Sequence, residues 1–313
     1  MSRALLLLRT AGRQRPDLLM GYQIMPNSLL CLGIGAIFGL QSAYQMTGGP
    51  IQLIGGGVGS ENVLLRRLRR PSRILERLVF HAVRQFDLVV VRGRSAREFV
   101  ECKRLSRNCL IVTGSVDTER FSPDNALADY DLVCVSRLVP RKGLEFLLSL
   151  VAHLCVSSPG VRFALVGDGP LREALEAQTQ ALGIAANVCF LGRRSDVVEV
   201  LRRSRAFILT SPSEGMSIAM PVAVTDVGDL RDAVIPGATG IFLSGDDPVS
   251  DARAVGKLLS NSPQLQAMSR AGRRLAEENY STAAVARKWD DFMRKVYAAA
   301  DIRASATREG PSQ

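Results

Sequence analysis

The chain has 313 residues, of which 47% are hydrophobic and 22% are charged, so it is long enough and apolar enough for two folded domains. Its 40 lysines and arginines outnumber its 30 acidic residues, and the net charge of +10 favours anionic partners such as nucleotide phosphates or an acidic membrane surface. Nucleic acid is the weakest of these interpretations, because aromatic residues make up only 5% of the chain and no nucleic-acid-binding motif is present.

The cysteines and histidines give no sign of a metal site. The six cysteines show no paired CxxC spacing, which is typical of buried reduced thiols in a cytosolic protein. With only two histidines, a histidine-based zinc site is not expected, and we predict no metal cofactor.

The most apolar stretch, residues 28–40, is shorter than the roughly 20 residues of a membrane-spanning helix, and residues 5–8 are too short for the core of a signal peptide. We therefore expect a cytoplasmic protein that can associate peripherally with the inner face of a membrane.

Short apolar runs alternate with longer amphipathic segments, a pattern that indicates βαβ units and parallel sheets. In the first part of the chain, it predicts strands near residues 17–20, 42–46, 87–92 and 109–112, joined by helices near 27–40, 60–84 and 95–104. Residues 113–130 are polar and rich in turn formers, and we interpret them as a linker.

The alternation restarts after the linker. It predicts strands at 132–135, 162–166, 188–191, 206–210, 222–225 and 240–243, and helices at 143–156, 170–182, 195–204 and from about 248 to 299. The predicted fold class is α/β, with two Rossmann-like, doubly wound domains of which the first is incomplete. We place the first domain at 1–122, the second at 123–283, and a C-terminal helix with a polar tail at 284–313.

Two cations follow the first predicted strand of the second domain. Arg137 and Lys142 stand five residues apart, and Gly143 precedes the next helix. This position lies at the carboxyl edge of a parallel sheet, where open α/β folds bind ligands. The next strand ends in a turn with Gly167 and Gly169, which allows a ligand to approach the backbone closely. Solvated charges at a strand end are the alternative interpretation of the two cations.

A second anion-binding turn is predicted after the strand at 206–210. The turn contains Glu214 and Gly215, and a helix begins near Met216 and Ser217. Free backbone N–H groups at a helix N-terminus can hold a phosphate. Glu214 can accept hydrogen bonds from sugar hydroxyls, or it can simply interact with the helix dipole.

Several segments match, in order, the motifs of a known enzyme family. They are residues 116–121, 136–138 with 142–143, 165–171, 190–192, 211–215, 221–228 and 237–240. The region 131–299 thereby resembles the nucleotide-sugar-binding half of a retaining glycosyltransferase of the GT-B architecture, in the group called GT4 or glycosyl transferases group 1. One segment alone would be weak, whereas the ordered set is specific.

The resemblance implies roles for these residues. Arg137 and Lys142 would hold the donor diphosphate, Glu214 would face the donor sugar, and Gly192 and Arg193 would lie along the nucleotide base. The implied reaction transfers a hexose from a UDP- or GDP-sugar to a glycan or lipid-linked acceptor with retention of configuration. It needs no metal, because fixed cations and a helix N-terminus stabilise the leaving diphosphate.

The chain also departs from the family pattern. A second Glu is expected eight residues after Glu214, but Val222 stands there and Met220 leads directly into Pro221. Residues 211–221 are few for a parallel crossover, which normally takes a dozen or more, so we expect a cramped connection or a disturbed strand order. The usual opening strand of the acceptor domain also has no counterpart. The resemblance thus implies a chain shortened at the N-terminus and after Met220, and the alternative function is a weakly active or inactive member that binds a nucleotide or a protein partner.

An arginine-rich stretch lies within the predicted helix at 60–84. Its arginines occupy positions 66, 67, 69, 70, 73, 77 and 84, with aliphatic residues between them. Such a helix either presents a solvated face or docks on an acidic membrane, and a lipid-linked acceptor favours docking. The expected partners are a nucleotide sugar, a glycan or lipid-linked acceptor and, through residues 66–84, an acidic membrane surface, but not nucleic acid.

Overall fold

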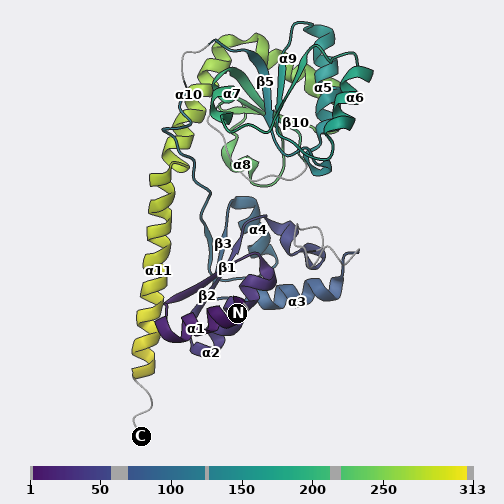
Figure 1. Ribbon diagram of the computed structural model, residues 1–313. Helices are drawn as coiled ribbons and strands as arrows, with labels where there is room; N and C mark the ends of the chain where they lie inside the picture. Colours follow the sequence, from purple (N-terminus) through teal and green to yellow (C-terminus); the bar gives the residue numbers. More distant parts are fainter. Residues whose placement is uncertain (1–2, 58–69, 124–126, 212–219, 309–313) are drawn as a thin grey trace. The chain divides into compact units, whose positions relative to one another are not determined.

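The computed structural model describes residues 3–57, 70–123, 127–211 and 220–308. The chain forms two compact units, of which unit 1 comprises residues 1–114 and 285–313 and unit 2 comprises residues 115–284 (Figure 1). Each unit is built on one parallel sheet, so the expected α/β class with two Rossmann-like units is confirmed. The division drawn from the sequence sets residues 284–313 apart, whereas the structure groups 285–313 with the N-terminal unit.

The sheet of unit 1 has four parallel strands in the order β1-β2-β3-β4. These strands are β1 (Leu18–Tyr22), β2 (Gln41–Met46), β3 (Leu88–Val91) and β4 (Cys109–Ile111). All four lie close to the positions predicted from their apolar runs. The register pairs Ala43 with Leu88 and Tyr44 with Val89, and successive side chains along each strand point to opposite faces.

One face of this sheet is covered by helices from the N-terminal part of the chain. The elements are α1 (Arg3–Gln14), η1 (Ile24–Ser28), α2 (Leu29–Phe38), η2 (Pro50–Gln52), η3 (Ile54–Gly56), α3 (Arg73–Arg84) and α4 (Arg94–Cys102). Tyr44 and Val89 pack in one cluster with Val79 of α3 and Val100 of α4. Helix α3 begins at Arg73, where the Ser72 hydroxyl caps it, and the earlier part of the predicted helix falls largely on residues 58–69, outside the described ones.

Helix α1 is not among the elements that the sequence analysis predicts. The run of leucines at 5–8 is apolar at four successive positions and therefore lacks helical periodicity. In the structure, Leu7, Leu8 and Ala11 lie on one side of α1 and pack with Cys31 of α2. The run is thus one turn of an ordinary amphipathic helix.

The other face of the unit 1 sheet is covered by helix α11 (Thr282–Arg308), from the far end of the chain. Ala43 and Val90 pack there with the buried side chains of Phe292 and Val296. Gln41 Nε2 also donates to the carbonyl oxygen of Val296 at 3.1 Å in a buried position. The core of unit 1 therefore includes helix α11, which follows unit 2 in the sequence.

Unit 2 has six parallel strands in the order β10-β9-β8-β5-β6-β7. The strands are β5 (Tyr130–Val135), β6 (Phe163–Val166), β7 (Val188–Gly192), β8 (Ser204–Leu209), β9 (Val222–Thr225) and β10 (Gly240–Leu243). Counted from β5, this is the order 3-2-1-4-5-6 of doubly wound dinucleotide-binding folds. Strands β8 and β9 are parallel neighbours, with Phe207 opposite Val222. The short connection therefore leaves the strand order undisturbed.

Helices lie on both sides of the unit 2 sheet (Figure 1). They are η5 (Pro140–Lys142), α5 (Leu144–Ser157), α6 (Arg172–Ala181), α7 (Val197–Arg202), α8 (Leu230–Ala233), α9 (Pro248–Ser260) and α10 (Ser262–Asn279). Helix α5 carries six buried residues into the main cluster, which also contains Leu165 and Val255. On the opposite face, Val200 of α7 packs with Val133 and Val166.

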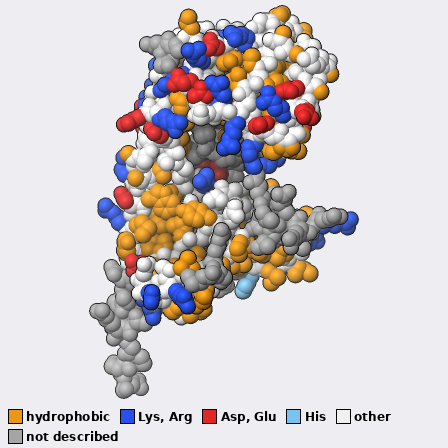
Figure 2. Space-filling view, viewed as in Figure 1, with side chains coloured by type: hydrophobic (Ala, Val, Ile, Leu, Met, Phe, Trp, Pro, Cys, Tyr) orange, Lys and Arg blue, Asp and Glu red, His pale blue; other side chains and the backbone are white. Residues whose placement is uncertain are grey.

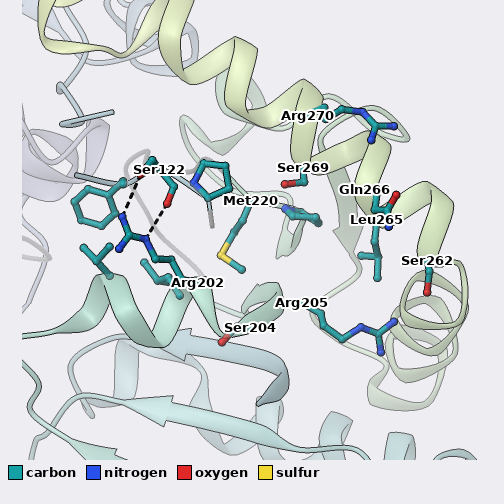
Figure 3. A pocket seen from close by; sticks show the side chains of 15 residues that line it. Ser122, Arg202, Ser204, Arg205, Met220, Ser262, Leu265, Gln266, Ser269 and Arg270 are labelled. Atoms are coloured by element: carbon teal, nitrogen blue, oxygen red, sulfur yellow. Dashed lines mark hydrogen bonds between the residues drawn. The ribbon is translucent and has the colours of Figure 1, made fainter. Parts of the chain in front are cut away.

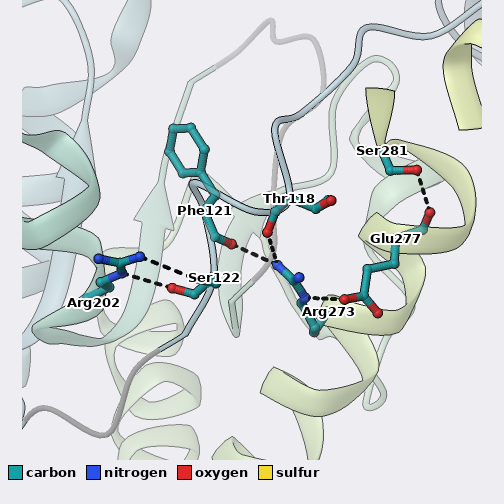
Figure 4. A network of polar contacts seen from close by, with 7 residues as sticks. All are labelled: Thr118, Phe121, Ser122, Arg202, Arg273, Glu277 and Ser281. Atoms are coloured by element: carbon teal, nitrogen blue, oxygen red, sulfur yellow. Dashed lines mark hydrogen bonds and ion pairs between the residues drawn. The ribbon is translucent and has the colours of Figure 1, made fainter. Parts of the chain in front are cut away.

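The segment that enters unit 2 is held by two arginines (Figure 4). Arg273 of α10 donates to the carbonyl oxygens of Thr118 and Phe121 at 2.6 and 3.0 Å. Arg202 of α7 donates to the carbonyl oxygen of Ser122 at 2.9 Å. This part of the predicted linker is therefore fixed to unit 2.

Charges on the visible surface of unit 2 are mixed in sign (Figure 2). Basic and acidic side chains are interspersed there. Exposed ion pairs of unit 2 include Arg203 with Asp129 at 2.9 Å and Arg231 with Asp226 at 2.6 Å. None of the helices in the described ranges is both long and apolar enough to cross a membrane.

Candidate functional site

The predicted diphosphate-binding cations lie at the carboxyl edge of the unit 2 sheet. Strand β5 ends at Val135, and the chain continues through Arg137 into the turn Pro140–Lys142. Arg137 is exposed, whereas Lys142 is buried, with only 9% of its surface accessible. Burial strengthens the field of an ammonium group, because less water screens it. One loop thus presents a solvated and a buried cation at the same edge.

Gly143 allows this loop to pack directly against the end of β8. Its φ is +62°, and a Cβ atom at this position would collide with the carbonyl oxygen of Thr210. Thr210 Oγ1 donates to the Gly143 carbonyl oxygen at 2.9 Å, and Ser211 Oγ donates to that of Arg141 at 3.1 Å. Thr225, at the end of β9, donates to the Ser211 carbonyl oxygen at 2.7 Å. Hydrogen bonds therefore join the chain segments that follow β5, β8 and β9.

The glycine turn after β6 packs against the same loop. Gly167 and Gly169 have φ values of 133° and 158°, and a Cβ atom at Gly169 would lie 2.5 Å from the carbonyl oxygen of Leu138. A Cβ atom at Gly167 would collide with the Ser136 carbonyl oxygen. The Leu138 N–H in turn donates to the Asp168 carbonyl oxygen at 3.0 Å. The neighbouring loop makes the close backbone approach that these glycines allow, and their contact with a ligand stays a prediction.

Gly192 and Arg193 follow β7 at the same edge. Gly192 has φ +64°, and its carbonyl oxygen accepts a hydrogen bond from the Gly167 N–H at 2.9 Å. Arg193 is exposed. The Arg172 guanidinium lies 5.8 Å from the centre of the Phe190 ring, a cation–π arrangement that supports this turn. The structure thus brings Arg137, Lys142, the glycines after β6, and Gly192 with Arg193 to one sheet edge.

The second predicted turn is not placed. Glu214, Gly215, Met216 and Ser217 lie outside the described residues, which stop at 211 and resume at 220. Their roles as sugar and phosphate contacts stay predictions. In the parts of the chain that are described, no group of three or more His, Cys, Asp or Glu side chains is arranged to hold a metal ion.

Thr210 and Ser211 are site residues that the sequence analysis missed. Thr210 is 5% and Ser211 0% exposed, and both bind the loop that carries the two cations. The sequence does contain a clue to their role, because two hydroxyl residues stand at the end of an apolar strand. Buried hydroxyls need hydrogen-bond partners. They connect the position of Lys142 to the end of β8.

Comparison with known proteins gives a family for this arrangement. The family model described as "Glycosyl transferases group 1" matches residues 115–275, which is about half of the chain. The GDP-mannose-dependent alpha-(1-6)-phosphatidylinositol monomannoside mannosyltransferase of Mycolicibacterium smegmatis is 32% identical over 193 residues, covering 53% of this chain and 50% of that protein. The D-inositol 3-phosphate glycosyltransferase of Segniliparus rotundus is 30% identical over 187 residues, covering 52% of this chain and 41% of that protein. The chain spans about half the length of the first curated relatives.

Solved structures resemble almost the whole chain. TarM matches with a TM-score of 0.73 and 15% identity, covering 92% of this chain and 57% of that one. Anabaena Alr3699/HepE in complex with UDP matches with a TM-score of 0.75 and 16% identity, covering 93% of this chain and 82% of that one. At such low identities the likeness shows the fold alone.

Proposed function

Because the chain belongs to the family of glycosyl transferases group 1, we propose that it transfers a hexose from a UDP- or GDP-sugar to a glycan or lipid-linked acceptor with retention of configuration. A relative named as GDP-mannose-dependent supports a nucleotide-sugar donor, and its phosphatidylinositol mannoside acceptor supports a lipid-linked one. A structural neighbour was solved in complex with UDP, which supports a UDP-sugar as the alternative donor.

One observation carries the proposal, namely the hydrogen-bonded set of loops at the carboxyl edge of the unit 2 sheet. The loop with Arg137 and Lys142 is fixed to the end of β8 through Thr210 and Ser211. A preorganised cation stabilises charge that develops in the transition state without having to reorganise first. This edge of the sheet is therefore suited to an anionic leaving group.

Each of the predicted site residues has a role in the proposed reaction. As the bond between the sugar and the donor phosphate breaks, the diphosphate gains negative charge. Arg137 and Lys142 would neutralise that charge, each through a charge-assisted contact of about 1.5–3 kcal/mol. Glu214 would orient the donor sugar, and Gly192 with Arg193 would lie along the base.

Donor turnover tests the proposal. The chain would be incubated with UDP-glucose, UDP-N-acetylglucosamine and GDP-mannose, and release of the nucleoside diphosphate would be measured. We expect turnover with at least one donor and a loss of about 10²–10³-fold in Arg137→Ala. Arg162→Ala is a matched control, because Arg162 precedes the amino end of β6 and its guanidinium stacks on Tyr130 at 5.4 Å. Unchanged turnover in Arg137→Ala would contradict the assignment.

A second candidate is a member of the family that binds a nucleotide or a protein partner with little catalysis. The start of β9 supports it, since the acidic position expected after Glu214 is occupied by Val222, which is buried as the first residue of that strand. A calorimetric titration with UDP and GDP, run beside the turnover assay, separates the two candidates. Binding without turnover of any donor would favour this one.

The arginine-rich segment supports an acidic membrane surface as a further partner. In the part that the structure describes, Ile74 and Leu78 of α3 are 74% and 61% exposed and stand beside the exposed Arg73 and Arg77. Figure 2 shows hydrophobic side chains in the region where Figure 1 places α3. Aliphatic side chains flanked by arginines are typical of helices that lie in a membrane interface. We therefore propose peripheral membrane association through α3, which remains compatible with a lipid-linked acceptor.

A further inference from the structure

A pocket of about 610 Å³ opens in unit 2 between helices α7 and α10 (Figure 3). Its lining includes Ser204 and Arg205 at the start of β8 and Met220 just before β9. The pocket therefore lies at the amino edge of the sheet. Strand β8 separates it from Thr210 at the carboxyl edge by roughly 17 Å, at about 3.3 Å per residue. It is distinct from the proposed donor site.

The pocket opens on the face of the unit 2 sheet that α7 covers. On this face α7 packs over Val133 and Val166 of β5 and β6, and Met220 lies beside the opening that remains.

The lining combines apolar residues with basic and polar ones. Leu201 and Met220 are among the apolar residues, and Arg202, Arg205 and Arg270 are the cations. No acidic side chain belongs to the lining that the structure describes. Arg202 and Arg205 are partly neutralised from outside the lining, by Glu199 at 2.8 Å and Asp131 at 2.7 Å. The residual charge is positive and is carried by Arg270.

Four polar side chains of α10 line the pocket. Ser262, Gln266, Ser269 and Arg270 follow one another at helical spacing along the helix and all line the pocket. No hydrogen bond or ion pair engages the side chains of these four within the described parts of the chain. In Figure 3, Ser269 projects toward Met220, whereas Arg270 extends in the opposite direction, on the side of Gln266. They offer one guanidinium, two hydroxyls and one amide to a ligand.

We propose that this pocket binds a small organic phosphate. The phosphate would accept hydrogen bonds from the Arg270 guanidinium and the Gln266 amide, which lie one helical turn apart, as arginine suits phosphate geometry. The carbon skeleton would lie against Met220 and Leu201, with the Ser269 hydroxyl available for its hydroxyl groups. The pocket volume falls within the range of about 300–1,000 Å³ that is usual for small-molecule sites. This inference does not rest on the proposed transferase activity.

The experiment titrates the full chain calorimetrically with glucose 6-phosphate, glycerol 3-phosphate and phosphoenolpyruvate at fixed ionic strength. Glucose and inorganic phosphate serve as the two partial probes. We expect at least one organic phosphate to bind saturably with a dissociation constant below about 1 mM and to raise the unfolding temperature, since ligands that bind only the folded state stabilise it. Glucose and inorganic phosphate should bind at least about tenfold more weakly.

Matched variants locate the binding. Arg270→Gln should weaken binding at least about tenfold, the loss expected for one charge-assisted contact. Arg274→Gln, an equal change of charge at an exposed position of α10 outside the lining, should change it less than about twofold. Arg137→Ala should leave it unchanged, which would distinguish the pocket from the donor site. The unfolding temperature of each variant without ligand checks that it is folded.

Three results would overturn the proposal. The first is the absence of binding by all three organic phosphates. The second is an equal effect of Arg270→Gln and Arg274→Gln, which would show that only the net charge of the helix matters. The third is inorganic phosphate bound as tightly as the organic phosphates, which would show that the apolar residues of the lining do not contribute to binding.

Discussion

The Nη1 atom of Arg273 lies 2.6 Å from the carbonyl oxygen of Thr118, a residue 155 positions earlier in the chain. The same atom reaches the carbonyl oxygen of Phe121 at 3.0 Å, and Nε pairs with Glu277 at 2.6 Å (Figure 4). One guanidinium thus fixes the first segment of unit 2 to helix α10, close to the end of that helix. Backbone carbonyls that have left a strand need such partners, because unpaired buried carbonyls are costly.

We expect Arg273→Ala to lower the free energy of unfolding by about 1–3 kcal/mol, since two charge-assisted hydrogen bonds are lost at a partly exposed site. Arg274→Ala is the control, because Arg274 is exposed on the same helix and should change stability by less than about 0.5 kcal/mol. Urea unfolding measures both variants. Limited proteolysis should also cut residues 117–123 faster in Arg273→Ala. Equal stability of the two variants would show that this contact is energetically unimportant.

Gly143→Ala should damage the proposed donor site through the backbone. The alanine would adopt φ near +62°, and its Cβ atom would meet the Thr210 carbonyl oxygen. Gly183→Ala isolates the conformational cost, because Gly183 has φ +70° but a Cβ atom there would meet no packed neighbour within 4 Å. We expect about 1 kcal/mol of destabilisation for Gly183→Ala and about 1–3 kcal/mol more for Gly143→Ala. Thermal unfolding checks the difference, and equal losses would contradict the close packing of this loop on β8.

Binding to acidic vesicles should depend on both kinds of side chain on α3. Arg77→Gln removes a cation near the surface and should weaken binding about fivefold, at about 1 kcal/mol per basic residue. Leu78→Ser removes an exposed apolar group and should also weaken it, whereas Arg274→Gln in unit 2 should not. Sedimentation with phosphatidylglycerol vesicles at low and high salt measures this. Since salt screens exposed charges, binding that is insensitive to salt would show that the arginines are not responsible.

The cysteines should react at very different rates. Burial raises the pKa of the Cys109 thiol to about 11, an effect that Glu101 reinforces and Arg97 opposes. The raised pKa leaves only about one thiolate in a thousand at pH 8, and the fraction should grow about tenfold per pH unit up to pH 10. Cys102, in the same unit, is exposed and should be alkylated first. Mass spectrometry after timed iodoacetamide treatment follows both sites, and equal rates at pH 8 would contradict the raised pKa of the partly buried Cys109 thiol.

The sequence predicted the strands well for a local reason. Short apolar runs rich in β-branched residues, such as Leu88–Val91 with its three valines, are typical of a buried strand. The alternation of strands and helices also indicates the α/β class with parallel sheets, but it does not determine the order of the strands in unit 2. The sequence analysis missed helix α1, because four successive leucines do not show the helical spacing of apolar and polar residues. The return of α11 to the first sheet could not be predicted, since an amphipathic helix does not indicate which sheet it covers.

The candidate site could be predicted only in part. Arg137 and Lys142 stand directly after a strand, so their position at the sheet edge follows from topology. The hydrogen bonds from Thr210 and Ser211 depend on which strands become neighbours, which the local sequence does not state. The pocket was beyond prediction for the same reason, because Ser204, Met220 and Arg270 come from separate segments.

The packing of α11 onto the sheet of unit 1 has a consequence for the order of folding. Strands β1 to β4 are synthesised before unit 2, whereas Phe292 and Val296 are synthesised after it. During this interval, the sheet face around Ala43 and Val90 has no cover, although unit 2 can already fold because its residues are contiguous. The sheet of unit 1 is therefore made before unit 2 but completed after it, and until then its apolar face is open to chaperones or to aggregation.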